Sequence, residues 1–252
     1  MKGNKKNNRI VIVIIIILLL IKFLVPLFES DEYVSDNDKY KNDNVFRILS
    51  STSTKKMDDN LIKYGKKNGI KVEIEHYGDL EIVDILNSDS SPYDAVWISN
   101  SLWLYMLDNT YLTTDSKSIV IDPVVMGITK SKAQELGFID KDIYNKDILN
   151  AIREGKLKYV MSSVTKTNTG ATSYLSFLNS MLGSPEVLTE AMLDSDSLKN
   201  DLKDFFKGVE RVSGDEEYLI EMYKNGNYNA MINYESSLIE LNQELVKSGK
   251  EP

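Results

Sequence analysis

The sequence predicts an α/β protein with two lobes, and three features lead to this prediction. Short β-branched runs alternate with helical patterns along residues 45–252. Loops rich in Ser and Thr follow several of these runs, as at the carboxyl ends of parallel strands, where ligands bind. An apolar segment at 118–129 contains Pro123, which suits a central strand poorly. We therefore interpret this segment as a crossover from one lobe to another.

The first lobe is expected to contain three strands separated by helices. Residues 45–49 form an apolar run, and residues 57–64 place apolar side chains on one helical face. Apolar and charged residues alternate over 70–76, which is typical of a strand with one buried face. A helix is predicted around 80–86 and a third strand over 93–98.

A second α/β unit follows the crossover. It is expected to begin with a helix near 147–154, a strand over 158–161 and a polar loop that enters a helix over 170–182. Residue 228 begins a further apolar run, which we interpret as a strand returning toward the first lobe. The other predicted helices cover 185–193, 198–207, 216–224 and 236–246.

The N-terminal region predicts a membrane anchor. Residues 10–28 are almost entirely apolar and long enough to span a bilayer if Lys22 reaches the far interface. Basic residues precede this run, which favours a cytoplasmic N-terminus and an extracytoplasmic domain. A cleaved signal peptide is the alternative, although the run ends in bulky residues. Residues 29–44 are polar and unpatterned, as in a flexible linker.

Composition excludes several classes of function. Beyond residue 28 the chain has 25 basic and 38 acidic residues, a net charge of −13, which argues against nucleic acid or anionic lipid as its partner. The absence of cysteine excludes disulfides, thiol catalysis, cysteine-ligated zinc and a lipid-modified cysteine anchor.

The sequence offers little support for catalysis. His76 is the single histidine, has no metal-ligand spacing around it, and is expected to be structural. The G-x-S-x-G, P-loop and G-x-G-x-x-G motifs are absent. Carboxylate pairs such as Asp58/Asp59 and Glu216/Glu217 are interpreted as solvated helix faces. We therefore do not expect an enzyme, and we expect no cofactor or metal. An extracytoplasmic hydrolase is kept as a third hypothesis, after the two binding functions described below.

Five segments carry a resemblance to a known family. In order, they are FRILSSTS, YDAVWISNSLW, IDPVVMGITKSKAQELGF, SSVTKTNTGATSYLSFL and YNAMINYESSLIELNQEL. The set resembles the bacterial type 2 periplasmic solute-binding proteins. It is most similar to the solute-binding part of proteins that also carry a von Willebrand A domain, and to molybdate-type binding proteins.

The resemblance implies a three-layer α/β fold in which two crossover strands join the lobes. It assigns residues 45–121 to lobe 1, 122–228 to lobe 2 and 229–252 to a return to lobe 1. In these families later residues complete the first lobe, so we expect an incomplete first lobe here.

The resemblance places two candidate ligand loops in the first lobe. Ser51 and Thr52 lie in the first loop, where hydroxyls and free amides at a helix start suit an anion. Ser99 and Asn100 lie in the second loop. Simple capping of the following helices is the alternative for both loops, including the helix that contains Trp103.

The other candidate contacts lie in the second lobe and at the crossovers. Asn168, Thr169 and Gly170 precede a helix, and Gly170 would allow close approach of a ligand to the backbone. An ordinary loop-to-helix junction is the alternative. Tyr234 resembles a hinge tyrosine that donates to ligand, with a buried structural tyrosine as its alternative. Val124 could offer backbone groups at the first crossover or serve only as a hinge.

Ligand class follows from what the loops contain. The arginines beyond the anchor, Arg47, Arg153 and Arg211, lie outside the hydroxyl loops, which disfavours amino acids. Trp97 and Trp103 are expected in the core rather than in a sugar platform. A small oxyanion is therefore the preferred ligand, captured for transport or sensing, with a membrane transporter or surface protein as partner. A ligand-free protein-interaction domain of a cell-surface complex is the alternative.

Overall fold

The computed structural model describes residues 44–88, 92–107 and 113–252. The chain divides into two units, Met1–Asn44 and Val45–Pro252. The expected anchor over 10–28 and nearly all of the expected linker over 29–44 lie outside the described residues. Among the helices of the described ranges, none is both long enough and apolar enough to cross a membrane.

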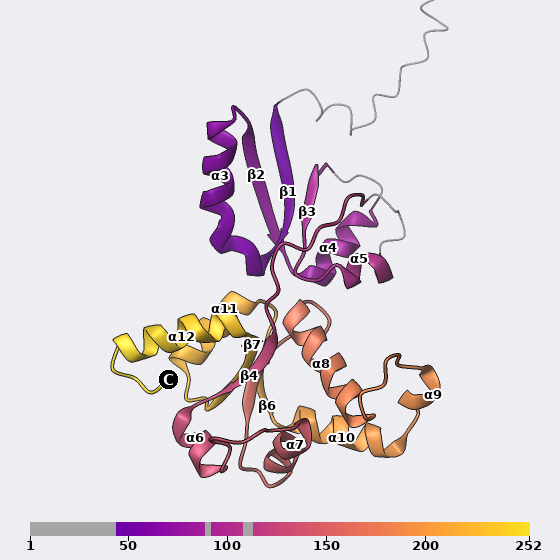
Figure 1. Cartoon of the computed structure of the whole chain (residues 1–252), viewed down its shortest axis with the longest axis vertical. Helices are drawn as coiled ribbons and strands as arrows, with labels where there is room; N and C mark the ends of the chain where they lie inside the picture. The colour runs from indigo at the N-terminus through magenta and orange to yellow at the C-terminus, as the bar shows by residue number, and fades with distance from the viewer. Residues whose placement is uncertain (1–43, 89–91, 108–112) are drawn as a thin grey trace, which may run out of the picture. The chain divides into compact units, whose positions relative to one another are not determined.

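The first lobe is built on a three-stranded parallel sheet in the order β2-β1-β3 (Figure 1). Its strands lie close to the predicted positions, because each is a short apolar or alternating run. Its elements in chain order are β1 (Val45–Ser51), η1 (Thr52–Met57), α3 (Asp58–Lys67), β2 (Lys71–Tyr77), α4 (Asp79–Leu86), β3 (Ala95–Trp97) and α5 (Leu102–Leu107).

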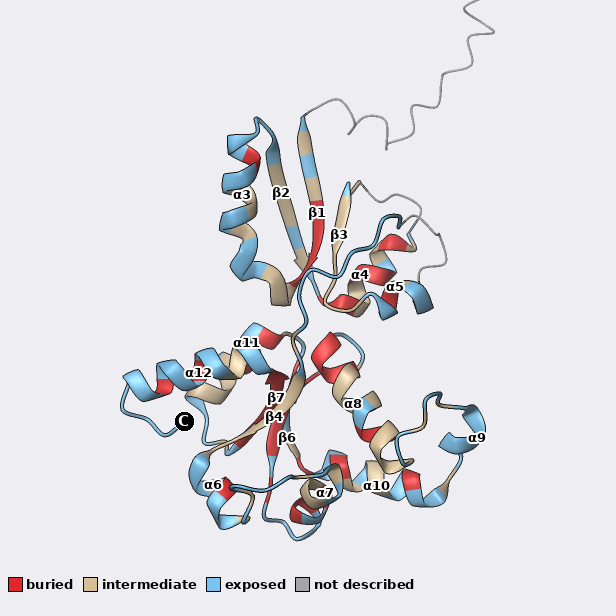
Figure 2. Ribbon diagram, viewed as in Figure 1, coloured by how far each residue is buried: buried red, intermediate tan, exposed pale blue. Residues whose placement is uncertain are grey.

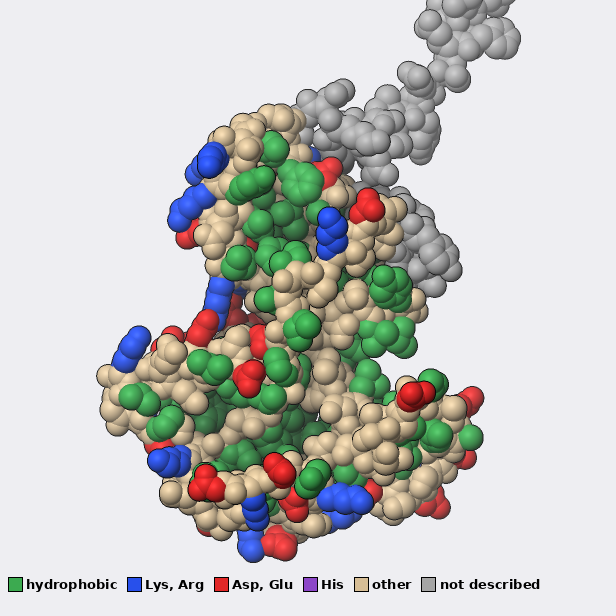
Figure 3. All heavy atoms as spheres, viewed as in Figure 1, with side chains coloured by type: hydrophobic (Ala, Val, Ile, Leu, Met, Phe, Trp, Pro, Cys, Tyr) green, Lys and Arg blue, Asp and Glu red, His purple; other side chains and the backbone are tan. Residues whose placement is uncertain are grey.

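The core of the first lobe is small. Leu49, Ile82 and Leu86 are buried together between the sheet and α4. Hydrophobic side chains also lie at the surface of this lobe (Figure 3). Among the strand residues, Phe46 and Tyr77 are 40% and 37% exposed. This lobe therefore buries little apolar area for its length.

The second lobe is built on a four-stranded mixed sheet in the order β4-β7-β5-β6. Strand β7 pairs antiparallel with β4 and parallel with β5, and β5 pairs parallel with β6. The elements in chain order are β4 (Val124–Ile128), α6 (Lys130–Glu135), α7 (Asn145–Arg153), β5 (Tyr159–Ser162), α8 (Asn168–Met181), α9 (Glu190–Leu193), α10 (Asp196–Lys207), β6 (Val209–Ser213), α11 (Glu216–Asn225), β7 (Ala230–Tyr234) and α12 (Glu235–Lys247).

The largest core lies in the second lobe. Figure 2 shows buried residues concentrated along its central strands and on the inner faces of the helices that cover them. Phe177 stacks on Phe205 with ring centroids 4.2 Å apart, and Tyr159 packs against the same ring. On the other face, Leu241 and Leu245 of α12 pack against the sheet. Burial of this many large side chains is the main stabilising term for the lobe.

The position of the last segment differs from the expectation. We expected 229–252 to return to the first lobe, but β7 is hydrogen-bonded within the second sheet and α12 packs against that sheet. The register runs from Val124 opposite Tyr234 to Ile128 opposite Ala230. This pairing joins segments about a hundred residues apart, which local periodicity does not report.

Two other local expectations need correction. Strand β6 was not predicted, because Glu210 and Arg211 interrupt its apolar pattern and both are exposed. The helix expected over 185–193 is limited to Glu190–Leu193, since the residues before it form bends. The missed strand matters for the site, since β6 leads directly to Glu216.

Candidate ligand-binding site

Polar side chains from both lobes gather beyond the carboxyl ends of the parallel strands, where open α/β sheets bind ligands. Each strand leads to a different contributor. In the first lobe they are Ser51 at the end of β1, Thr52 after it, Asp79 after β2 and Ser99 after β3; in the second they are Asn168 and Thr169 after β5, Glu216 after β6 and Tyr234 at the end of β7.

Asp79 is the centre of the first-lobe side of this cluster. Its side chain is fully buried. Oδ1 accepts the backbone N–H of Ser99 at 2.7 Å, and Oδ2 accepts the hydroxyl of Ser51 at 3.0 Å. The backbone N–H of Asn168 donates to Oδ2 across the lobes at 3.4 Å. The carboxyl group of Asp79 thus binds donors from three loops.

Glu216 is the centre of the second-lobe side. Only 4% of the residue is exposed. Oε2 accepts the hydroxyl of Thr52 at 3.0 Å, and Oε1 accepts the hydroxyl of Thr169 at 3.1 Å. The expectation that Glu216 and Glu217 both lie on a solvated helix face is therefore wrong for Glu216, whereas the side chain of Glu217 is 65% exposed.

Asn168 links the two lobes through its side chain as well as its backbone. Oδ1 accepts the indole N–H of Trp103 at 2.7 Å, and Nδ2 donates to the hydroxyl oxygen of Tyr234 at 2.8 Å. Trp103 is buried, as expected for a core residue, and packs with Val83 and Ala171. The candidate ligand residue Asn168 is thus also a structural bridge.

Burial governs the ionisation of this cluster. Burial raises the pKa of Asp79, and the hydrogen bonds from Ser99, Ser51 and Asn168 oppose that increase. Burial also raises the pKa of Glu216, and repulsion from Asp79 raises it further. The pKa of the Tyr234 hydroxyl is raised by burial as well. These two carboxyl groups therefore resist carrying full negative charge together.

The charged side chains around the cluster pair with one another. Lys55 binds Glu217 at 2.9 Å and Lys166 binds Glu81 at 3.2 Å, in both cases across the lobes. These ion pairs are largely exposed and contribute little stability. The buried carboxyl groups instead depend on hydroxyl and amide donors.

Three candidate residues lie outside the hydrogen-bonded cluster. The side-chain oxygen of Asn100 accepts the backbone N–H of Leu102 at the start of α5. This is the capping role that was the alternative to ligand contact. Val124 is a sheet residue opposite Tyr234. A Cβ atom on Gly170 would lie 2.3 Å from the carbonyl oxygen of Ser163. The absence of a side chain at Gly170 therefore permits close packing of α8 on the preceding loop, rather than serving ligand approach alone.

His76 has a structural role, as expected. Its Nδ1 lies 2.9 Å from the carbonyl oxygen of Ser51, and its Nε2 lies 2.9 Å from Oδ2 of Asp58. The ring joins β2 to the end of β1 and to the start of α3. It thereby helps to fix the loop that carries Ser51.

Sequence reasoning missed Asp79 and Glu216. Asp79 follows Gly78 at the start of a predicted helix, where an acidic residue is favoured for helix-dipole reasons alone. Glu216 follows an unpredicted strand. The signal that could have found both is their position, since each lies two or three residues beyond the end of a parallel strand.

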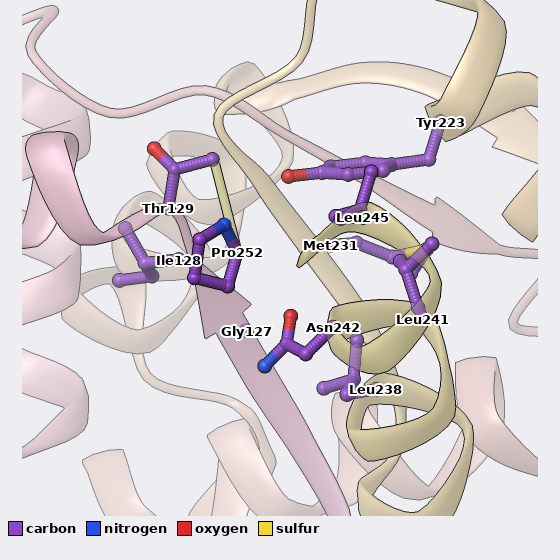
Figure 4. A pocket seen from close by; sticks show the side chains of 10 residues that line it. All are labelled: Gly127, Ile128, Thr129, Tyr223, Met231, Leu238, Leu241, Asn242, Leu245 and Pro252. Atoms are coloured by element: carbon purple, nitrogen blue, oxygen red, sulfur yellow. The ribbon is translucent and has the colours of Figure 1, made fainter. Parts of the chain in front are cut away.

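A hollow of about 50 Å³ lies elsewhere, between β4 and α12 (Figure 4). Leu238, Leu241 and Leu245 line it, together with Thr129, whose hydroxyl oxygen is buried without a hydrogen-bond partner among the described residues. The hollow could hold a water molecule but is too small for a solute.

Comparison with solved structures identifies the fold. A two-component system protein that mediates signal transduction has a TM-score of 0.57 and 18% identity, covering 79% of this chain and 67% of that one. Iron-bound HitA from Pseudomonas aeruginosa has a TM-score of 0.56 and 13% identity, with coverages of 82% and 67%. The sulfate-binding protein SubI from Mycobacterium tuberculosis has a TM-score of 0.54 and 13% identity, with coverages of 82% and 68%.

At these identities the similarity establishes the fold, and the chain has the mixed α/β fold of periplasmic binding proteins. A scan of protein-family models and a search of the curated proteins found no match. The solved structures are described as a signal-transduction protein, a sulfate-binding protein and an iron-bound protein.

Proposed function

We propose that the chain is a solute-binding domain that captures a small ligand between its two lobes, for transport or sensing. One observation carries the proposal. Ser51, Thr52 and Ser99 of the first lobe join Asn168 and Thr169 of the second in a cluster connected by hydrogen bonds. A set of hydrogen-bonding groups held by two lobes is the arrangement that can close around a solute.

A small oxyanion remains the proposed ligand class, but its binding depends on the charge and position of the two buried carboxyl groups. Hydroxyl and amide donors suit an oxyanion. The buried carboxyl groups of Asp79 and Glu216 would repel it if both were ionised. We therefore expect an anion to enter only when these groups are protonated or have moved away from the donors. SubI and HitA, which share the fold, are described as sulfate-binding and iron-bound.

The proposed location is the outer face of a cell membrane, with residues 10–28 as a single-pass anchor. Its support is the apolar run and the basic residues before it. A transporter or another surface protein is the proposed partner, and a von Willebrand A module in the same polypeptide would suit that setting. Protease added to intact cells should digest residues 45–252. Full protection of this domain, or its release as a processed soluble form, would contradict the anchor.

A ligand-free protein-interaction domain is the second candidate. It is favoured by the fact that the loop hydroxyls of Ser51, Thr52 and Thr169 are already bonded to the protein's own carboxyl groups. A domain that has lost its ligand could use this arrangement to keep its lobes together. Capture of a defined surface protein in the absence of any solute would support this candidate.

A thermal-shift panel separates the two candidates. The full chain is heated with molybdate, sulfate, phosphate, sugars or amino acids, at about pH 5 and about pH 7.5, because the lower pH favours the protonated carboxyl groups. A ligand present at about 100 times its dissociation constant stabilises the folded state by about 2.7 kcal/mol. A specific shift supports solute binding. A panel without any shift at either pH contradicts it and leaves the interaction domain as the better function.

A further inference from the structure

Two carboxyl groups make reciprocal hydrogen bonds between the lobes. Glu216 belongs to the second lobe and accepts a hydroxyl hydrogen bond from Thr52 of the first. Asp79 belongs to the first lobe and accepts a backbone hydrogen bond from Asn168 of the second. Each lobe therefore contributes one carboxyl acceptor and one donor. We call these four residues the carboxyl latch.

The latch lies within a closed contact between the lobes. Apolar side chains of Val83, Trp103 and Ala171 pack together, so α4 and α5 of the first lobe contact α8 of the second. The backbone N–H of Leu80 donates to the carbonyl oxygen of Lys166 at 3.3 Å. A Cβ atom on Gly78 would lie 2.4 Å from that same oxygen, so the two backbones approach closely.

The carboxyl groups take the donors that a bound anion would require. Glu216 accepts one hydroxyl from each lobe, through Thr52 and Thr169. Asp79 accepts a hydroxyl and a backbone amide from its own lobe and an amide from the other. A carboxylate presents acceptor oxygens as an oxyanion does, so it satisfies the same donors.

The neighbouring lysines pair with other acids, so the donors to Asp79 and Glu216 are hydroxyl and amide groups. Lys55 pairs with Glu217, and Lys166 pairs with Glu81, both at the exposed edge of the contact. The charged group that acts on Glu216 most strongly is Asp79, which is also acidic. The latch therefore costs desolvation of two acids, which the donors from the opposite lobe offset.

We infer that Asp79 and Glu216 serve as internal substitutes for an anionic ligand, holding the lobes closed when the site is empty and competing with a solute for the same donors. The first part, self-closure, stands on the cross-lobe geometry alone. The second part, competition, rests on the proposed solute-binding function.

The distance between the lobes tests self-closure directly. The chain has no cysteine, so cysteines introduced at Tyr64 and Tyr144 can carry spin labels without further changes. Both positions are exposed, at 69% and 68%, on α3 and next to α7 respectively. Pulsed electron paramagnetic resonance on the labelled full chain, with no solute added, measures the populations of short and long distances between the two labels.

Four variants sharpen the measurement. Glu216→Ala removes the acceptor, and Thr52→Val removes its donor from the opposite lobe while keeping the side-chain shape. Glu216→Gln retains an acceptor oxygen, and threonine hydroxyls can also accept from its amide group. Glu217→Ala is the matched control, because it removes the adjacent, exposed ion pair across the same contact.

Self-closure predicts a short distance in the unmodified chain, in Glu216→Gln and in Glu217→Ala. Glu216→Ala and Thr52→Val should each shift the closed-to-open ratio by about tenfold toward open. The double variant should shift this ratio little further, because both changes remove the same hydrogen bond between the lobes. If Glu216→Ala opens no more than Glu217→Ala, the inference is overturned. Thr52→Val gives the same decision if Glu216→Ala fails to fold.

Competition is tested with the same chains. In a thermal-shift series with sulfate, molybdate and phosphate, Glu216→Ala should bind the responding anion about tenfold more tightly than Glu217→Ala, because the Thr52 and Thr169 hydroxyls are then free to bind the anion. Equal affinity for both chains overturns competition. If none of these anions binds either chain, the proposed oxyanion function fails, while the distance measurement still decides self-closure.

Discussion

The hydroxyl of Thr52 donates to Oε2 of Glu216 at 3.0 Å, although 164 residues separate them in the chain. Thr52 follows β1, the central strand of the first sheet, and Glu216 follows β6, an edge strand of the second. Both lie beyond the carboxyl ends of parallel strands. This hydrogen bond is one of the connections between the lobes at the candidate site. A change at Glu216 should therefore affect both stability and ligand binding.

Replacing Thr169 by Val should destabilise the domain and weaken solute binding. The change keeps the side-chain shape but removes the hydroxyl that donates to Oε1 of Glu216. An unsatisfied buried acceptor costs about 1–3 kcal/mol, measured as a lower midpoint of urea unfolding. Thr165→Val is the control, since Thr165 is exposed. Equal midpoints for the two variants would show that the Thr169 bond contributes nothing.

Replacing Glu216 by Gln should flatten the pH dependence of stability. The folded-state pKa values of Asp79 and Glu216 are raised, so the folded chain retains protons that the unfolded chain has released. Stability from these groups is therefore lost as pH rises above the ordinary carboxyl values of 3.8 and 4.5 and through the raised values.

Urea unfolding of both chains from about pH 4 to about pH 8 measures this difference. Glu216→Gln should gain stability relative to the unmodified chain as pH rises, because it carries no charge to bury. Carboxyl groups far from Glu216 contribute equally to both curves and cancel, whereas Asp79 is no longer repelled in the variant and adds to the difference. Parallel curves would show that Glu216 does not titrate in this range.

Replacing Gly170 by Val should be more damaging than removing any single hydroxyl. A Cβ atom there would lie 2.3 Å from the carbonyl oxygen of Ser163 and 2.7 Å from that of Ser162. Backbone atoms cannot move aside cheaply, so the change should cost at least about 1–3 kcal/mol. Gly214→Ala is the control, since its nearest contact would be 3.8 Å away on a flexible lysine. Calorimetry of both variants should therefore show a lower Tm for the Gly170 variant only.

Replacing Trp103 by Phe should loosen the contact between the lobes with little loss of burial. The indole N–H donates to Oδ1 of Asn168 at 2.7 Å, and Phe has no donor to replace it. Thr172 also donates to that oxygen, so the cost should be modest, about 1 kcal/mol. Faster amide hydrogen exchange at the start of α8 is the expected result, and unchanged exchange would contradict it. Trp97→Phe serves as the comparison, because Trp97 lies on β3 within the first sheet.

The α/β class and most of the strands could be predicted from the sequence. Runs such as that of β1 and the alternation of β2 depend on side-chain periodicity over a few residues, which is a local property. The structural role of His76 was also predictable, since a lone histidine without metal-ligand spacing needs only ordinary hydrogen-bond partners. The hydroxyl loops were found for the same local reason.

The placement of β7 and the identity of the buried acids were not predictable in this way. Strand β7 pairs with β4 because apolar surfaces far apart in the chain are buried together, and no local pattern records the partner. Asp79 and Glu216 look like ordinary helix-start acids in the sequence. Their burial depends on loops from the opposite lobe.

The sequence by itself determined most of the strands and helices in order, the hydroxyl loops at strand ends, the cysteine-free composition and the acidic balance, because each follows from residue identity and spacing. The tertiary structure decided which donors those hydroxyls meet. Asp79 and Glu216 share one cluster because strands from both sheets end at the same place, and burial there changes the pKa of each carboxyl group. Desolvation and repulsion depend on distance in space, which the separation of residues along the chain does not contain.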